Sequence, residues 1–285
     1  MPPYFVNASD GVVEAWSTTR LQFEPRGWQR EFRATLRSEI SALRGTELPL
    51  NAQYRSAVRE HCDTQNILFY NVGTSAFAAA AAAGVHFERG YVVPACSVDL
   101  CGAPLHYHRY ETRGDMNGLF HLWRETSQLA YFDCLLPRLS ADTKPATVWL
   151  AMHQASERVR ASAVWRGAFA LRLRLRVPES HASPVTIVKP LLDGVVAAFC
   201  AYEGTRLIVA AERVASQLGL DAQQAAELLT DRSRGLLGHY ELVVPRATSV
   251  QWQPPDDRCV ACDLRLEIGT PAGRLDGELL AVTER

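Results

Sequence analysis

The chain has 285 residues, which fits one large domain or two ordinary ones and is long enough to bury a substantial hydrophobic core. Hydrophobic residues make up 47% of it and charged residues 21%, a balance that excludes an intrinsically disordered chain. The net charge of −1 provides no global attraction to nucleic acid, so any nucleic-acid-binding function would need a local basic patch.

The N-terminus and the cysteines bear on the compartment. Residues 1–7 lack the basic and apolar regions of a signal peptide, and no segment approaches the ~20 apolar residues of a membrane span. The seven cysteines are an odd number, which fits reduced thiols better than a disulfide framework. We therefore expect a cytoplasmic protein without a membrane partner.

The first half of the chain is predicted to alternate between strands and helices. Apolar residues recur at helical spacing from Trp28 to Leu43, with charged residues between them, which predicts an amphipathic helix. The other expected elements are, in chain order, a strand within 11–23, a buried strand at 66–72, a poly-alanine helix that ends at Gly84, strands at 85–93 and 105–110, and a helix at 117–136.

The second half is expected to follow a linker at residues 140–145, Ser-Ala-Asp-Thr-Lys-Pro. The linker divides the chain into an N-terminal α/β domain of residues 1–143 and a C-terminal α/β domain of residues 144–285. The elements expected after it are strands at 147–152 and 169–177, helices at 195–202, 210–218 and 222–229, the last capped by Asp221, and strands at 242–244, 259–267 and 274–282.

This order of elements predicts the fold class. Strands and helices alternate without a strict repeat, which indicates an α+β (mixed α/β) fold with a mixed sheet flanked by helices. The two halves also show a short echo: Asp63-Thr-Gln-Asn66 precedes an apolar segment much as Lys189-Pro-Leu-Leu-Asp193 does. A diverged duplication, with two related halves, is one reading of this echo.

The clearest strand, residues 169–177, carries a ladder of arginines. Leu171, Leu173, Leu175 and Val177 alternate with Arg172, Arg174 and Arg176. Because side chains alternate across a strand, we expect the apolar residues to be buried and the arginines to be more exposed. Such a face suits the phosphates of DNA or another polar partner, and equally suits pairing with glutamates on neighbouring strands.

A lysine and three aspartates form the first candidate site. Asp193, Asp256 and Asp257 are expected near strand ends, with Lys189 beside them. Carboxylates placed a few ångströms apart hold Mg²⁺ in phosphodiester hydrolysis, and a cation stabilises the charge that develops on the phosphate. We expect Asp193 to lie close to Asp256 or Asp257, in a cleft bordered by Lys189. The alternative is that Asp193 caps a helix and that Asp256 and Asp257 form a turn.

The order of these motifs resembles the RusA-type Holliday-junction resolvases. An alternating strand is followed by the turn Lys189-Pro-Leu-Leu-Asp-Gly194, an apolar helix from Val195 to Tyr202, and Asp256-Asp-Arg-Cys-Val260 opening a strand. The resemblance implies a strand-to-helix turn at 189–194 and Mg²⁺ ligands at Asp193 and at one or both of Asp256 and Asp257. Leu191 stands where the family has its first aspartate, and Gly194 where it has an asparagine.

Because Leu191 replaces an aspartate of the family, we rank a binding function above a nuclease function. The first hypothesis is a nucleic-acid-binding or assembly subunit with a decayed metal-dependent nuclease site, acting as a homo-oligomer or in a complex. The second is an active Mg²⁺-dependent, structure-selective endonuclease that uses Lys189, Asp193, Asp256 and Asp257. Under both hypotheses, Arg172, Arg174 and Arg176 would contact DNA.

A third hypothesis rests on histidines. His106 and His108 are two residues apart on an expected strand, a known metal-ligand spacing, with Glu111 nearby. They would centre an unrelated small-molecule metalloenzyme, but no third ligand is evident, and ordinary surface histidines are the favoured interpretation. Cys259 and Cys262 are expected on opposite faces of a strand as core residues.

Overall fold

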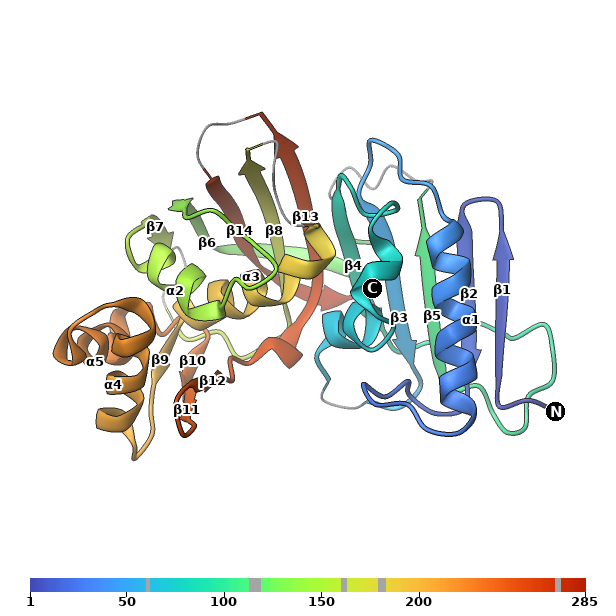
Figure 1. Ribbon diagram of the computed structural model, residues 1–285, viewed down its shortest axis with the longest axis horizontal. Coiled ribbons are helices and arrows are strands. Elements are labelled where there is room, and N and C mark those ends of the chain that lie inside the picture. Colours follow the sequence, from blue (N-terminus) through green and yellow to red (C-terminus); the bar gives the residue numbers. More distant parts are fainter. Residues whose placement is uncertain (60–61, 113–118, 160–162, 179–182, 270–272) are drawn as a thin grey trace.

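A computed structural model describes the chain except for residues 60–61, 113–118, 160–162, 179–182 and 270–272 (Figure 1). Within the described residues, the main sheet is mixed and has ten strands, in the order β1-β2-β5-β3-β4-β13-β8-β14-β6-β7. The strands are β1 (Tyr4–Ser9), β2 (Val12–Ser17), β3 (Leu50–Ser56), β4 (Gly84–Gly90), β5 (His106–Glu111), β6 (Trp123–Leu136), β7 (Ser156–Val159), β8 (Phe169–Val177), β13 (Cys259–Ile268) and β14 (Gly273–Glu284). The α+β fold class predicted from the sequence is confirmed.

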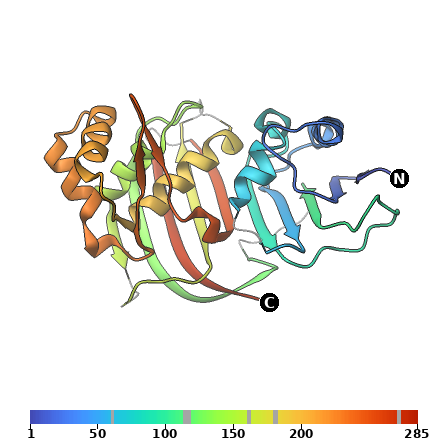
Figure 2. The same cartoon turned by 90° about the horizontal axis from the view of Figure 1, so that it is seen from below.

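The helices gather on one face of this sheet and leave the other face open (Figures 1 and 2). They are α1 (Trp28–Ala42), α2 (Pro145–His153), α3 (Pro184–Ala198), α4 (Leu207–Leu218) and α5 (Ala222–Thr230), with short helical turns η1 (Asn66–Tyr70), η2 (Thr74–Phe77), η3 (Arg232–Arg234) and η4 (Asp256–Arg258). Two small ribbons, β9 (Cys200–Tyr202) with β10 (Gly238–Tyr240) and β11 (Val243–Pro245) with β12 (Val250–Trp252), lie beside α4 and α5. In the described parts of the chain, none of the helices has the length and apolar character needed to cross a membrane.

Strand β8 and helix α3 form the core of the second half. The four apolar residues of the alternation, Leu171 to Val177, are at most 2% exposed, as predicted. Helix α3 lies over them and is itself covered by α2, so that it is buried along most of its length. Helix α2 approaches so closely that a Cβ at Gly194 would lie 2.5 Å from Cβ of Val148.

The two halves repeat one topology. In the first half, the parallel strands β3 and β4 are joined through η1 and η2, with β5 antiparallel to β3 and β2 antiparallel to β5. In the second half, the parallel strands β8 and β13 are joined through α3, with β14 antiparallel to β8 and β6 antiparallel to β14. The halves meet at the antiparallel pair β4–β13. This shared order favours the reading of two related halves.

The division between the halves falls between β5 and β6. Strand β6 pairs with β14 and β7 of the second half, so a boundary at residue 143 would separate it from its partners. Residues 140–145 instead connect β6 to α2 within that half.

Four predicted elements are wrong, and a fifth ends early. The poly-alanine segment before Gly84 is helical only at η2, and residues 78–83 form turns. The helix expected at 195–202 ends at Ala198, and residues 200–202 form β9.

Residues 66–72 are helical at η1, and residues 147–152 belong to α2 rather than to a strand. Both are short apolar runs, in which periodicity alone does not separate a buried helix from a buried strand. Residues 123–136 form β6 instead of a helix. The pairing of β6 with β14 shifts register twice, which breaks the alternation that marks a strand.

The turn expected at Lys189–Gly194 is also wrong. These residues lie inside α3, which begins at Pro184 and contains Pro190. Pro184 occupies the first position of the helix, where proline is well tolerated, and Pro190 lies in its interior. A register shift between Cys259 and Ala261 likewise changes which residues of β13 share a face. Cys259 and Cys262 are therefore both buried in the main core, rather than on opposite faces.

Candidate functional site

The predicted lysine and aspartates do come together, around Lys189. Its ammonium Nζ lies 2.6 Å from Oδ2 of Asp63, 3.2 Å from Oδ1 of Asp193 and 3.2 Å from Oδ2 of Asp256. Helix α3 carries Lys189 and Asp193 one turn apart, η4 carries Asp256, and Asp63 precedes η1. The expected proximity of Asp193 and Asp256 is confirmed. Asp63 was missed, although it begins the segment that echoes Lys189–Asp193.

Charge in this cluster is unbalanced, with one ammonium among three carboxyl groups. Burial and the neighbouring Asp63 raise the pKa of Asp256 to about 8, against an attraction to Lys189. Burial also raises the pKa of Asp193 to about 6, although Lys189 opposes the shift. Burial would lower the pKa of Lys189, but the carboxylates outweigh it and raise that pKa above its usual range. Asp256 therefore retains its proton near neutral pH, and Lys189 stays charged.

This arrangement does not fit Mg²⁺. The ammonium of Lys189 occupies the position between the carboxylates at which a metal ion would lie. Within the residues that the structure describes, no group of three His, Cys, Asp or Glu side chains is placed to hold a metal ion. Asp257, the third predicted ligand, makes a different contact, because its carbonyl oxygen accepts a 2.7 Å hydrogen bond from Arg89. The cluster thus links the two halves, because Asp63 belongs to the first half and Lys189, Asp193 and Asp256 belong to the second.

The histidine pair lies in the core, so the expectation of surface histidines is wrong. Nδ1 of His106 is 2.8 Å from the hydroxyl of Tyr54 and 3.2 Å from that of Ser56. The ring of His108 packs against Tyr54 and against Phe32 of α1. Burial, together with His106, lowers the pKa of His108 to about 3, so its imidazole is neutral. Both rings serve packing.

The arginine ladder of β8 is paired with acids on neighbouring strands. Arg172 contacts Glu278 on β14 at 2.8 Å, and Arg174 contacts Glu267 on β13 at 3.1 Å. Arg176 contacts the same Glu267 at 3.0 Å, together with Asp276 on β14. The predicted exposure of the ladder is confirmed, with the three side chains 29% to 52% exposed. Of the two readings offered for this face, pairing with neighbouring acids is the one observed.

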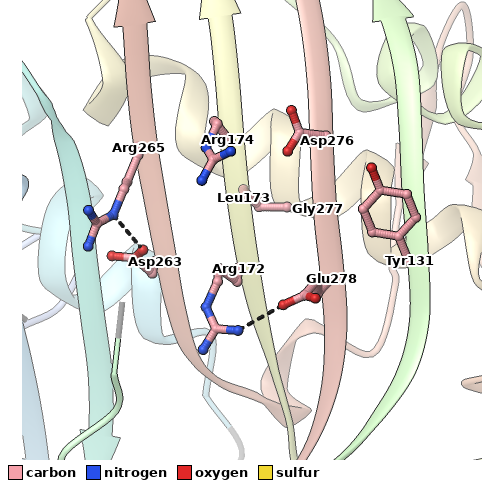
Figure 3. A pocket seen from close by; sticks show the side chains of 9 residues that line it. All are labelled: Tyr131, Arg172, Leu173, Arg174, Asp263, Arg265, Asp276, Gly277 and Glu278. Atoms are coloured by element: carbon pink, nitrogen blue, oxygen red, sulfur yellow. Dashed lines mark hydrogen bonds and ion pairs between the residues drawn. The ribbon is translucent and has the colours of Figure 1, made fainter. Parts of the chain in front are cut away.

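A pocket of about 410 Å³ opens on this face, on the side of the sheet away from the helices (Figure 3). Arg172 and Arg174 stand between the β13 side chains and the acids of β14, with the Tyr131 ring on β6 beyond (Figure 3). Leu173 of β8 and Gly277 of β14 also line the pocket. Charged residues from the two neighbours of β8 complete the lining: Asp263 and Arg265 on β13, and Asp276 and Glu278 on β14. Four adjacent strands thus line the hollow, and two of them, β8 and β13, supply its three arginines.

A buried polar chain supports the pocket from β4. Asp263 accepts a 3.0 Å hydrogen bond from Nε of Arg265, and its other oxygen lies 3.1 Å from Nδ1 of His86. Nε2 of His86 lies 3.4 Å from Glu88. Glu88 in turn accepts hydrogen bonds from the backbone N–H groups of residues 121 and 122, at 2.9 and 2.7 Å.

Sequence reasoning missed this chain and the pocket. Both lie in segments that were correctly predicted as strands, 85–93 and 259–267. The available signal was the recurrence of His86 and Glu88, and of Asp263 and Arg265, at every second position of otherwise apolar strands. Buried charged residues require partners, so this pattern can indicate a site.

Comparisons with protein-family models, curated proteins and solved structures find no match. The resemblance to RusA-type resolvases therefore stays a prediction from the sequence.

Proposed function

We propose that the protein binds a small organic anion, such as a carboxylate with further polar groups, in the pocket on the open sheet face. The observation that carries this proposal is the presence of three arginines, Arg172, Arg174 and Arg265, in the lining of a hollow of about 410 Å³. That volume is within the range of small-molecule sites. A guanidinium group has five N–H donors in a fixed fork, so one that is paired with an acid can still bind a carboxylate.

The lining favours a small ligand over a nucleic-acid strand. Asp276 and Glu278 stand on the strand beside Arg172 and Arg174, where they would repel an extended run of phosphates. They suit hydroxyl or amino groups of a compact ligand that also carries an anionic group.

The seven cysteines form no disulfide, which supports the cytoplasmic location predicted from the sequence.

A binding screen with two arginine variants tests the proposal. Sulfate, succinate, citrate and benzoate would be titrated into the protein at low salt by calorimetry, with chemical shifts recorded in parallel. We expect at least one anion to bind, and Arg174→Gln to weaken it about tenfold, the effect of losing a charge-assisted hydrogen bond. Arg176→Gln is the matched control, because Arg176 lies on the same strand and face, shares Glu267, and does not line the pocket.

The nucleic-acid hypotheses predict a different result for the same variants. If the ladder bound DNA, branched DNA should bind with a steep salt dependence, and Arg174→Gln and Arg176→Gln should weaken it alike. Cleavage in Mg²⁺ that Asp256→Asn abolishes would favour the endonuclease. Failure of every anion to bind, or equal loss in the two variants, would overturn the proposal of a pocket for small anions.

A further inference from the structure

Both ring nitrogens of His86 face carboxylate oxygens. Nδ1 lies 3.1 Å from Asp263 and Nε2 lies 3.4 Å from Glu88, and all three side chains are at most 2% exposed. A neutral imidazole has one N–H, so its other nitrogen would place a lone pair against an oxygen. With both carboxyl groups ionised, the imidazolium, with its two donors, is the form that satisfies both contacts. The geometry therefore indicates that His86 holds a proton inside the sheet.

This proton is connected to the pocket through Asp263. One oxygen of Asp263 faces His86, and the other accepts from Nε of Arg265, whose guanidinium lines the pocket. On the opposite side of β4, β3 places the uncharged residues Asn51 and Gln53 next to His86 and Glu88. Phe120 covers the His86 ring, at 5.5 Å between centroids.

In the described part of the chain, few other charges are found around this chain of contacts. Arg172 pairs in register with Asp263 from β8, and its guanidinium lies over the Phe120 ring at 6.0 Å. The segment that covers the site also carries His121, whose backbone N–H donates to Glu88. Among the residues that the structure describes, the charged groups in contact with His86 are thus Glu88 and Asp263, with Arg265, Arg172 and His121 one contact further away. The two closest are carboxylates.

We propose that His86 is a proton-dependent positioning residue for the pocket: its imidazolium holds Asp263, and Asp263 holds the guanidinium of Arg265 in place at the edge of the pocket. The role in ligand binding rests on the proposed function, whereas the link between His86 and Arg265 does not. When Nδ1 loses its proton, a buried lone pair is left against Asp263, so this carboxylate turns away and Arg265 is released.

The direction of the pH dependence follows from the same contacts. Burial would lower the pKa of His86, but the hydrogen bonds and charges of Asp263 and Glu88 outweigh it and raise that pKa. The imidazolium is therefore complete below the ordinary histidine pKa of about 6.5 and is lost only as the pH rises through the higher folded value. Anion binding should be strongest at the acidic end of this range.

Nuclear magnetic resonance without any ligand tests the positioning step. The protein would be labelled with ¹⁵N in histidine and arginine, with the His86 ring assigned by His86→Gln and the Arg265 side chain by Arg265→Gln. We expect His86 to titrate above the ordinary value, and the Nε–H signal of Arg265 to broaden and exchange at the same pH. A neutral His86 at pH 6, or an Arg265 signal unaffected by its titration, would overturn the inference.

Sulfate supplies the second measurement, because it stays doubly charged across this range. We expect sulfate affinity to fall about tenfold as His86 loses its proton, and Glu88→Gln to move both transitions to lower pH. Sulfate binding that does not change with His86 protonation would overturn the inference and leave the proposed function standing. Absence of sulfate binding at every pH, together with coupled His86 and Arg265 signals, would count against the proposed function alone.

Discussion

Lys189 illustrates how one side chain can satisfy several buried groups. It is one of two lysines in the chain, and it contacts three aspartates from three segments. Burying carboxylates is costly unless a cation compensates them. The motif that suggested a metal site is thus explained by a lysine in the position of the metal.

The first prediction is that Lys189→Met strongly destabilises the protein. The substitution keeps much of the side-chain length but leaves three carboxyl groups without their cation, at a cost of about 3 kcal/mol in the free energy of unfolding. Urea denaturation at pH 7.5 measures this cost. Lys144→Met is the control, because the other lysine is exposed, and it should change stability little. Equal changes in the unfolding free energy of the two variants would show that the Lys189 cluster does not stabilise the fold.

The second prediction concerns the pH dependence of stability. The folded pKa of Asp256, about 8, lies above the usual 3.8, so its contribution is complete below about pH 4 and is lost as the pH rises through 8. Asp256→Asn mimics the protonated form at every pH. Its free energy of unfolding relative to the wild type should therefore rise between pH 5 and pH 8, by about 1.4 kcal/mol for each pH unit. A constant or falling difference in urea denaturation would contradict it.

At the scale of elements, α2 and α3 are in unusually close contact. Pro145 and Val148 of α2 lie against Gly194, which has no side chain to hold the helices apart. This contact covers the buried helix that carries Lys189 and Asp193. A glycine in the middle of a helix otherwise weakens it, so the residue is explained by packing.

The third prediction follows from that contact. Gly194→Ala improves helix propensity by about 1 kcal/mol, but its Cβ would lie 2.5 Å from Cβ of Val148 and 2.7 Å from the carbonyl oxygen of Pro145. We expect overpacking to prevail and the variant to lose about 2 kcal/mol. Thermal and urea unfolding measure the balance. A variant as stable as the wild type, or more stable, would show that α2 can move away from α3.

At the scale of the whole molecule, one antiparallel strand pair joins two halves of the same topology. Strands β4 and β13 carry this junction, and the polar chain from Glu88 to Arg265 crosses it. The Lys189 cluster joins the halves on the helical side of the sheet, through Asp63. The proposed pocket lies on the open side, and its support therefore depends on both halves.

The fourth prediction tests the junction at Gly84, where β4 begins. Its φ of +129° disfavours other residues, and a Cβ there would lie 2.1 Å from the carbonyl oxygen of Leu264 on β13. Gly84→Ala should cost about 3 kcal/mol of unfolding free energy, because strain and overpacking act together. Gly219→Ala, with a φ of +67° and no atom within 4 Å, is the control and should cost only about 1 kcal/mol. Similar losses of unfolding free energy in the two variants would show that β4 and β13 can move apart at Gly84 without further cost.

The sequence alone determined the elements whose patterns are local. The amphipathic helix α1, the alternating strand β8 and the Asp221 cap of α5 were predicted from spacing, because one face of each is buried and the other is polar. The proximity of Lys189, Asp193 and Asp256 was also predicted, from a motif of carboxylates and a lysine that suggested a metal site. The fold class followed from the order of the elements.

Only the tertiary structure decided the rest. The helix α2 and the turn η1 are apolar runs without a distinguishing period, and β6 loses its alternation at register shifts that β14 imposes. The roles of Asp63, His86 and Asp263 depend on partners more than 120 residues away in the chain. Local spacing carries no information on such pairs, because they form only when the two halves of the sheet meet at β4 and β13.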